Sequence, residues 1–151
     1  MIYIDIVQNV FNEKIYSELK EYIETNSLYN PLVTKSKPTV SKRFPIIPVK
    51  LLTYNNKYNN LSYGEETYRF GIEIDINCQD KQIDDKQVSR RTICEELIEL
   101  TMQYFINNYR VRIRVNPNAI NTDERVHRAI IRITGIIDTK YGLDRLVVYP
   151  R

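Results

Sequence analysis

The most regular pattern in the chain is an alternation of apolar and polar residues between positions 66 and 78. Because successive side chains of a β-strand point to opposite faces, this alternation predicts a strand with two different faces. The apolar face consists of Tyr68, Phe70, Ile72, Ile74, Ile76 and Cys78, and the polar face of Arg69, Glu73, Asp75 and Asn77. A sheet with one buried and one wet face is typical of an antiparallel architecture.

Two other segments place apolar residues at helical spacing. The first runs from about residue 9 to 25, with Phe11, Ile15, Leu19, Tyr22 and Ile23 on one side. The second runs from about residue 89 to 107 and follows Ser89, whose hydroxyl is suited to cap a helix. Its apolar stripe consists of Val88, Cys94, Leu97, Ile98, Thr101, Met102 and Phe105. We expect this second helix to pack on the apolar face of the sheet.

Further strands are predicted on both sides of the second helix. Residues 46–54 precede it, and Pro48, which has no N–H to donate, favours an edge position for that strand. Residues 110–115 and 126–137 follow the helix, the latter as a long central strand, and a short strand is predicted at 146–149. Residues 79–87 are predicted to form a polar turn.

Proline and asparagine mark the irregular parts of the chain. Residues 30–48 hold prolines that exclude a long helix or a central strand, so we expect an extended basic arm there. Residues 55–64 are rich in Asn and Tyr and predict a hairpin tip, while residues 139–151 form a C-terminal extension. We expect residues 34–50 and 55–63 to be mobile in an isolated subunit and ordered only against neighbours, because neither segment can build a core of its own.

Runs of strands around a single helix, without repeated βαβ units, indicate an α+β fold. We predict a mostly antiparallel sheet of about four strands with two helices packed on it. At 151 residues the chain has the size of one domain. The predicted core joins two sets of side chains: Phe70, Ile72, Ile74, Ile131 and Ile133 of the sheet, and Cys94, Leu97, Ile98 and Phe105 of the second helix.

Charge is distributed unevenly along the chain, although the formal net charge is only +3. Residues 34–50 carry a net +5 and residues 110–151 another +5, whereas residues 1–33 carry −3 and residues 51–109 carry −4. Such a distribution suits a nucleic acid, and it equally suits complementary edges of identical subunits.

The cysteines and the hydropathy limit where the protein works. Cys78 and Cys94 each fall on an apolar face without CxxC spacing, which favours two buried free thiols in a reducing compartment. No apolar run approaches the roughly 18 residues of a membrane span, and the first residues lack the pattern of a signal peptide. We therefore expect neither a membrane-embedded protein nor secretion by a signal peptide.

Candidate catalytic groups are few. His127 is the only histidine, and its place within a strand favours a structural or surface role. Glu73 and Asp75 share a strand face, as the carboxylates of a metal-dependent nuclease do, but no third acid or lysine accompanies them at a telling spacing. The glycines stand singly, which argues against a phosphate-binding loop. We predict no catalytic residue, no cofactor and no metal ion.

Four arginines form the strongest candidate surface. Arg112 and Arg114 share one face of their strand, and Arg128 and Arg132 share a face of the next. If the two strands pair, these side chains form a basic patch. A protein interface or ordinary ion pairs are favoured, because the glycine-aromatic motif of an RNA-binding sheet is missing, but a nucleic-acid contact stays open.

Four segments between residues 9 and 138 together resemble the tail-terminator or tail-completion (neck) proteins of tailed bacteriophages. They are Phe44-Pro45-Ile46-Ile47-Pro48-Val49, the alternating run from Glu66 to Asp80, Val88-Ser89-Arg90-Arg91, and the run Val126-His127-Arg128-Ala129-Ile130-Ile131-Arg132-Ile133-Thr134-Gly135-Ile136-Ile137-Asp138. The chain departs from that family in its basic, proline-bearing arm and in residues 141–151.

The resemblance implies a virion structural protein without catalysis, made in the host cytoplasm. Such a subunit forms a ring, a hexamer in this family, that caps the tail tube, joins the head connector and lets DNA pass. Its interface residues would be Lys42, Arg43, Tyr54, Tyr58, Arg112, Arg114, Arg128 and Arg132. The alternatives are another connector subunit (stopper or adaptor), a nucleic-acid-binding module that uses the arginine face, and a nuclease around Glu73 and Asp75.

Overall fold

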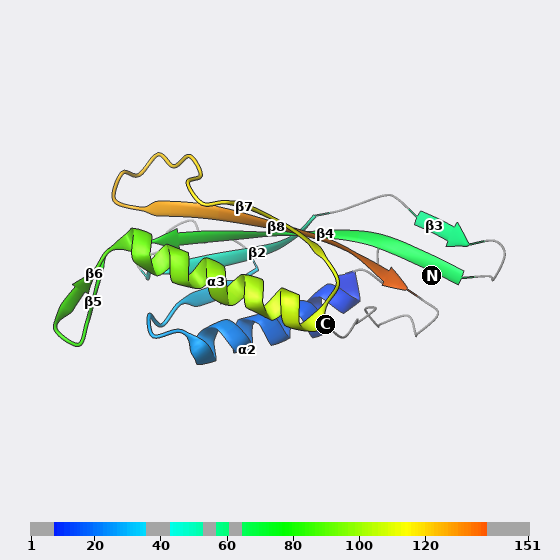
Figure 1. Cartoon of the computed structure of the whole chain (residues 1–151), viewed down its shortest axis with the longest axis horizontal. Helices are drawn as coiled ribbons and strands as arrows, with labels where there is room; N and C mark the ends of the chain where they lie inside the picture. The colour runs from blue at the N-terminus through cyan, green and yellow to red at the C-terminus, as the bar shows by residue number, and fades with distance from the viewer. Residues whose placement is uncertain (1–7, 36–42, 53–56, 61–64, 139–151) are drawn as a thin grey trace.

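The computed structural model describes residues 8–35, 43–52, 57–60 and 65–138 (Figure 1). A first helix starts at residue 8 and continues through a π-helical stretch, η1, into α2. The elements in chain order are η1 (Phe11–Tyr16), α2 (Ser17–Asn26), β1 (Leu32–Thr34), β2 (Ile46–Leu52), β3 (Lys57–Asn60), β4 (Glu65–Cys78), β5 (Lys81–Ile83), β6 (Lys86–Val88), α3 (Arg90–Asn108), β7 (Arg112–Asn116) and β8 (His127–Asp138).

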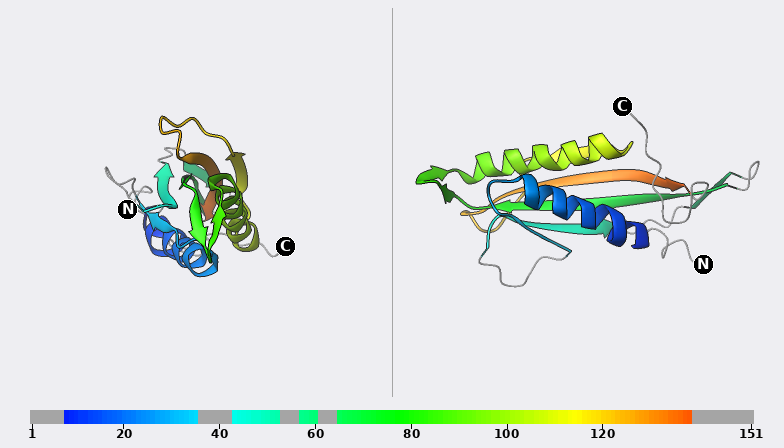
Figure 2. Two further views of the ribbon diagram at one scale, coloured as in Figure 1. Left: turned by 90° about the vertical axis from the view of Figure 1, so that its left-hand side faces the viewer. Right: turned by 90° about the horizontal axis from the view of Figure 1, so that it is seen from below.

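The main sheet has the strand order β1-β2-β4-β8-β7, and β3 pairs with β4 beside this path. The long strands β4 and β8 form its centre as an antiparallel ladder that runs from Thr67 opposite Asp138 to Cys78 opposite His127. Both helices lie on one face of the sheet, and the β3–β4 and β5–β6 hairpins extend from opposite ends (Figures 1 and 2). The predicted α+β class is confirmed.

The sheet differs from the prediction in strand number and direction. It has six strands rather than about four, and it is mixed, because β1 runs parallel to β2 while the other pairs are antiparallel. The two extra strands come from segments whose prolines and asparagines indicated irregular structure. A pairing between distant segments therefore overrode their local preference.

The core lies where the alternating pattern placed it. Of the apolar face of β4, the described side chains Phe70, Ile72, Ile74, Ile76 and Cys78 are all buried, as are Ala129, Ile131 and Ile133 of β8. They pack against Ile93, Cys94, Leu97, Thr101, Tyr104 and Phe105 of α3. Ile98 and Met102 are only half-buried, because they lie to one side of this stripe. Ile93 and Tyr104 occupy the core positions that the predicted stripe missed.

The cap predicted for α3 is confirmed, and a polar contact fixes α3 to the first helix. The Ser89 hydroxyl oxygen accepts a hydrogen bond from the Thr92 backbone N–H at 3.2 Å, which satisfies one free donor of the first turn. At the other end, the buried Tyr104 hydroxyl donates to Glu18 Oε2 at 3.0 Å and lies 3.2 Å from the Tyr109 hydroxyl. This contact joins the C-terminal end of α3 to the start of α2.

The arm predicted over residues 30–48 is partly a strand pair. Val33 is buried on β1, and Ile46 and Ile47 are buried on β2. The edge position predicted for residues 46–54 is wrong as well, because β2 lies between β1 and β4. Pro48 is tolerated there because the ladder with β4 pairs Ile46 and then resumes at Val49, leaving the proline without a partner in β4. Residues 46–50 are thus part of a paired strand, while the mobility expected of the segment stays a prediction.

The polar turn predicted over residues 79–87 is a two-stranded hairpin, β5–β6. Asp84 and Asp85 form its two-residue loop, and their φ angles are 51° and 64°. Two positive φ angles are what the tightest hairpin loops need, and Asp tolerates this conformation better than most residues. The hairpin precedes α3 directly and extends the molecule at that end (Figure 1).

Several other sequence predictions can be compared with the structure. Cys78 and Cys94 are buried free thiols, as expected. The hairpin tip is bounded by the antiparallel pair β3–β4, although residues 55–56 and 61–64 lie outside the described residues. The strand predicted at 146–149 and the extension 139–151 also lie outside them. Among the described residues, no helix is both long and apolar enough to cross a membrane.

Candidate interaction surface

The face of the sheet that points away from the helices carries a row of charged side chains. Lys50 of β2 stands opposite Glu73 of β4, Glu73 opposite Arg132 of β8, and Arg132 opposite Arg114 of β7. Directly opposite residues share one face of a sheet, so this row crosses four strands. We call this side the open face and define it by Lys50, Glu73, Asp75, Arg112, Arg114, Arg128 and Arg132.

The two arginines of β8 are held by the carboxylates of β4. Arg128 makes a two-point contact with Asp75, with Nε 2.8 Å from Oδ1 and Nη2 2.9 Å from Oδ2. Arg132 Nη2 lies 3.2 Å from Glu73 Oε1. The hydrogen bond to Asp75 raises the pKa of Arg128, against the opposing effect of partial burial. These two arginines therefore stabilise the sheet and are less available to a partner.

Arg112 and Arg114 differ from Arg128 and Arg132 in their exposure and in their contacts with carboxylates. Both are exposed on β7, which is the edge strand of the sheet in the part of the chain that the structure describes. Within that same part, neither side chain reaches a carboxylate within ion-pair distance. Val115 on the same strand is 37% exposed. The described sheet thus ends in an edge with two unmatched positive charges.

The carboxylates proposed for a nuclease are engaged by these contacts. Glu73 and Asp75 each bind an arginine, and the described residues contain no group of three or more His, Cys, Asp or Glu side chains that could hold a metal ion. His127 Nε2 lies 2.8 Å from the Pro117 carbonyl oxygen, which fixes the loop between β7 and β8. This contact agrees with the structural or surface role expected of His127, and the contacts of Glu73 and Asp75 give the nuclease no support.

Of the remaining predicted interface residues, Arg43 and Tyr58 belong to the part of the chain that the structure describes. Arg43 is exposed, and its Nη2 donates to the backbone and side-chain oxygens of Asn30 at 3.2 and 3.0 Å, which places it beside the turn before β1. Tyr58 lies on β3 opposite Thr67. Lys42 and Tyr54 lie outside the described residues.

Asn77 departs from the solvent-facing position that the alternation predicted. Its side chain is 1% exposed, and Nδ2 donates to Asp75 Oδ1 at 3.1 Å and to the Ile46 carbonyl at 3.5 Å. It thereby helps to orient the carboxylate that binds Arg128. The alternation gave the correct face, but it could not show that this end of the face is covered.

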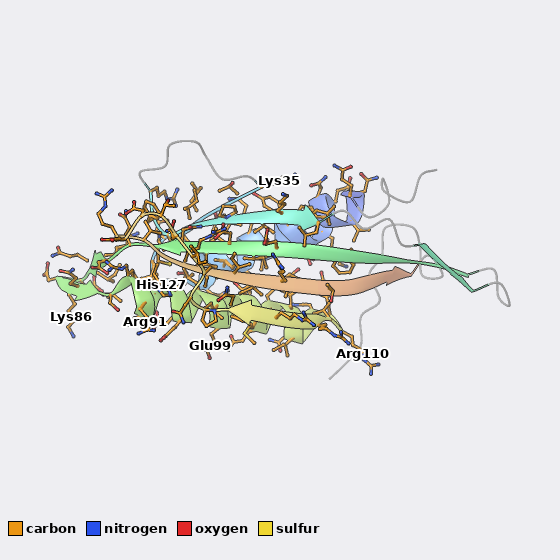
Figure 3. The ribbon with its side chains drawn as sticks, turned by 90° about the horizontal axis from the view of Figure 1, so that it is seen from above. Lys35, Lys86, Arg91, Glu99, Arg110 and His127 are labelled. Atoms are coloured by element: carbon orange, nitrogen blue, oxygen red, sulfur yellow. The ribbon has the colours of Figure 1, made fainter. Side chains whose placement is uncertain are left out.

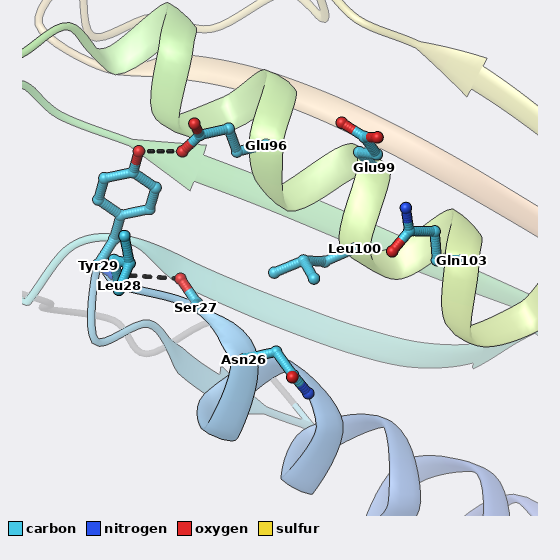
Figure 4. Close-up of a pocket in the computed structure, with 8 residues that line it drawn as sticks. All are labelled: Asn26, Ser27, Leu28, Tyr29, Glu96, Glu99, Leu100 and Gln103. Atoms are coloured by element: carbon cyan, nitrogen blue, oxygen red, sulfur yellow. Dashed lines mark hydrogen bonds between the residues drawn. The ribbon is translucent and has the colours of Figure 1, made fainter.

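A groove between the end of α2 and α3 was not found from the sequence (Figure 4). It encloses about 230 Å³, and its walls include Leu28, Tyr29, Glu96, Glu99, Leu100 and Gln103. The Tyr29 hydroxyl donates a hydrogen bond to Glu96, and burial together with this bond raises the pKa of Tyr29 to about 12. Leu28, in contrast, is 80% exposed. Apolar and acidic groups thus meet in one accessible depression.

Neither a comparison with models of known protein families nor one with curated proteins finds a match to this chain. The contrast between its two surfaces is therefore the strongest functional observation. The open face holds more basic than acidic side chains. The helix layer has the opposite balance, with Glu13, Glu18, Glu21, Glu24, Glu95, Glu96 and Glu99 against Lys14, Lys20, Arg90 and Arg91.

Proposed function

We propose that this chain is a structural subunit of a bacteriophage neck, a tail terminator that forms a ring on the last ring of the tail tube. The observation that carries the proposal is the exposed edge strand β7, where Arg112 and Arg114 find no carboxylate in the described part of their own chain. A surface of this kind suits a subunit that is completed by its neighbours. The assignment to a phage tail depends on the resemblance of residues 9–138 to neck proteins.

The mechanism we propose is capping. A growing tube presents unpaired edges that recruit further subunits, in the same way that an exposed sheet edge recruits another strand. A ring of terminator subunits would cover those edges on one side and offer the head connector a new surface on the other. Identical subunits close into a ring when each contact joins two different patches around a closed rotation. A hexamer, DNA passage through the ring and a place in the virion belong to the same proposal.

A nucleic-acid-binding module is the second candidate, and one observation favours it. Arg112 and Arg114 are exposed and unmatched by acids in the described residues, as phosphate-binding side chains would be. Arg128 and Arg132 weaken this alternative, because both are already bound to carboxylates. Half of the predicted basic patch is thus engaged within the chain.

The test of the proposed function is an arrest of tube growth. Tube subunits from the same phage would be polymerised with and without this chain, and tube lengths measured by electron microscopy. We expect short tubes with the protein at one end, and tails of uncontrolled or unjoined form in infections that lack it. Tubes that grow equally long in its presence, together with normal tails in its absence, would refute the proposal.

A further inference from the structure

The groove between α2 and α3 has the chemistry of a receptor for a long cationic side chain. Leu28 and Leu100 offer apolar surface, while Glu96 and Glu99 contribute two carboxylates. An arginine side chain has the same division, with an apolar stem and a charged, hydrogen-bonding head. Tyr29 holds Glu96 by its hydrogen bond, so at least one carboxylate is already oriented.

No basic residue is among those that line this groove. Arg112 and Arg114, which make no ion pair with the described residues, project from the open face, whereas the groove belongs to the helix layer on the opposite side of the sheet. Figures 3 and 4 show the two surfaces separately. The sheet lies between the acidic groove and these arginines, so one copy cannot join its own two patches.

We propose that the groove receives Arg114 of a second copy of this chain, with Arg112 beside its rim. Charge complementarity selects this occupant, because an acidic groove without a cation and an exposed edge with unmatched arginines occur on the same molecule. The contact joins two different patches, so each copy uses its edge on one neighbour and its groove on the other. Such head-to-tail contacts generate a closed ring when the rotation closes.

This inference rests on the ring proposed above, but it concerns only the contact between copies. It can therefore fail or hold independently of tube capping. If the chain self-associates through the groove but does not change tube length, the proposed contact is supported and the tail function is refuted. Tube arrest by a chain whose groove variants behave like the wild type would do the reverse.

The experiment is a charge exchange between the two patches. Arg114→Glu places a carboxylate against the acidic groove, and Glu99→Arg places a guanidinium against Arg114 of the neighbouring copy. We expect each variant alone to associate at least about tenfold more weakly than the wild type, since like charges in a contact are repulsive. An equimolar mixture should regain association, because position 114 of one variant then meets position 99 of the other with opposite charge. The double variant Arg114→Glu/Glu99→Arg should regain association without a partner.

Solution mass, measured by light scattering across a wide concentration range, is compared with the 18.0 kDa of one chain. Lys86→Glu is the matched control, because it makes the same charge change at the exposed β6 strand, away from Glu99 (Figure 3). Thermal unfolding of each variant verifies that the fold is intact. The proposal is overturned by a wild type that stays monomeric throughout, by variants that associate normally, or by a mixture that regains nothing. A groove that binds a basic peptide of another protein, in a chain that does not self-associate, also overturns the proposal.

Discussion

At the scale of single residues, the centre of the sheet depends on a close approach between an aromatic ring and a glycine. Phe70 of β4 stands opposite Gly135 of β8 and is 2% exposed. A methyl group on Gly135 would lie 2.7 Å from two ring carbons of Phe70 and 3.0 Å from a methyl of Val111. The ring therefore covers the position that a side chain would occupy, a device known to compensate for glycine in strands.

Gly135→Ala should consequently destabilise the protein by roughly 1–3 kcal/mol, the usual cost of forcing extra atoms into a packed core. Urea unfolding would measure the loss. The double variant Gly135→Ala/Phe70→Leu should regain part of it, because the smaller side chain makes room. An unchanged unfolding midpoint for Gly135→Ala would show that Phe70 can move aside without cost.

Tyr109 links residue chemistry to pH. Its side chain is 3% exposed, and burial raises its pKa to about 12, with Glu18 acting in the same direction and Tyr104 opposing. An unfolded tyrosine titrates near pH 10. The folded state therefore holds this proton more tightly, so its contribution to stability is complete below about pH 10 and is lost as pH rises towards about 12.

We expect Tyr109→Phe to show a shallower loss of stability than the wild type between pH 10 and about 12. The variant is less stable at neutral pH, because the hydroxyl contact with Tyr104 is gone, so the slope rather than the absolute value is the readout. Urea unfolding at several pH values measures it. Parallel curves for the two proteins would contradict the contribution assigned to Tyr109.

At the scale of elements, α3 packs against the apolar face of the sheet and covers the core residues of β4 and β8. Leu97 is fully buried at the middle of the helix, facing β4 and β8. Leu97→Ala should cost roughly 2–5 kcal/mol, the range found when a large buried side chain leaves a cavity. Ile120→Ala is the control, since Ile120 is 89% exposed and exposed positions change stability by about 0.5 kcal/mol or less. Equal losses in thermal unfolding would refute the assigned helix face.

The length of an element decides whether the sequence pattern predicts it. Periodicity gave β4, β8 and α3, because each spans enough residues for its pattern to be distinct. It missed β1 and the β5–β6 hairpin, whose strands are three residues each. A strand that short has no readable period, and each of the three residues of β1 pairs with a residue of β2 that is distant in sequence.

The candidate surface was predictable to the same extent. Alternation placed Arg112 with Arg114 and Arg128 with Arg132 on common faces, and the structure agrees. It could not show that Arg132 meets Glu73, because that contact depends on the register between β4 and β8. The groove was beyond reach for a related reason, since Leu28 and Glu99 come together only through the angle between α2 and α3.

At the scale of the whole molecule, a sheet separates a predominantly basic face from a predominantly acidic helix layer. Under the proposed function this polarity serves contacts between identical subunits, whereas in the alternative the basic face attracts nucleic acid through its phosphates. The two functions differ in whether Arg112 and Arg114 contribute to the free energy of self-association or to that of DNA binding. Their removal should affect self-association in one case and the salt dependence of DNA binding in the other.

We therefore expect Arg112→Ala/Arg114→Ala to leave any DNA affinity of the chain, and its dependence on salt, unchanged. Each phosphate contact contributes about 0.9 to the slope of log affinity against log salt, so a face that binds DNA through both arginines would lose a slope of about 2. Fluorescence anisotropy with duplex and single-stranded DNA, repeated over a range of salt concentrations, measures this slope. Lys86→Ala, which removes one positive charge away from the open face, is the control and should leave the slope unchanged. If the slope falls by about 2 in the arginine variant alone, Arg112 and Arg114 bind DNA phosphates. They would then not form the proposed contact between copies.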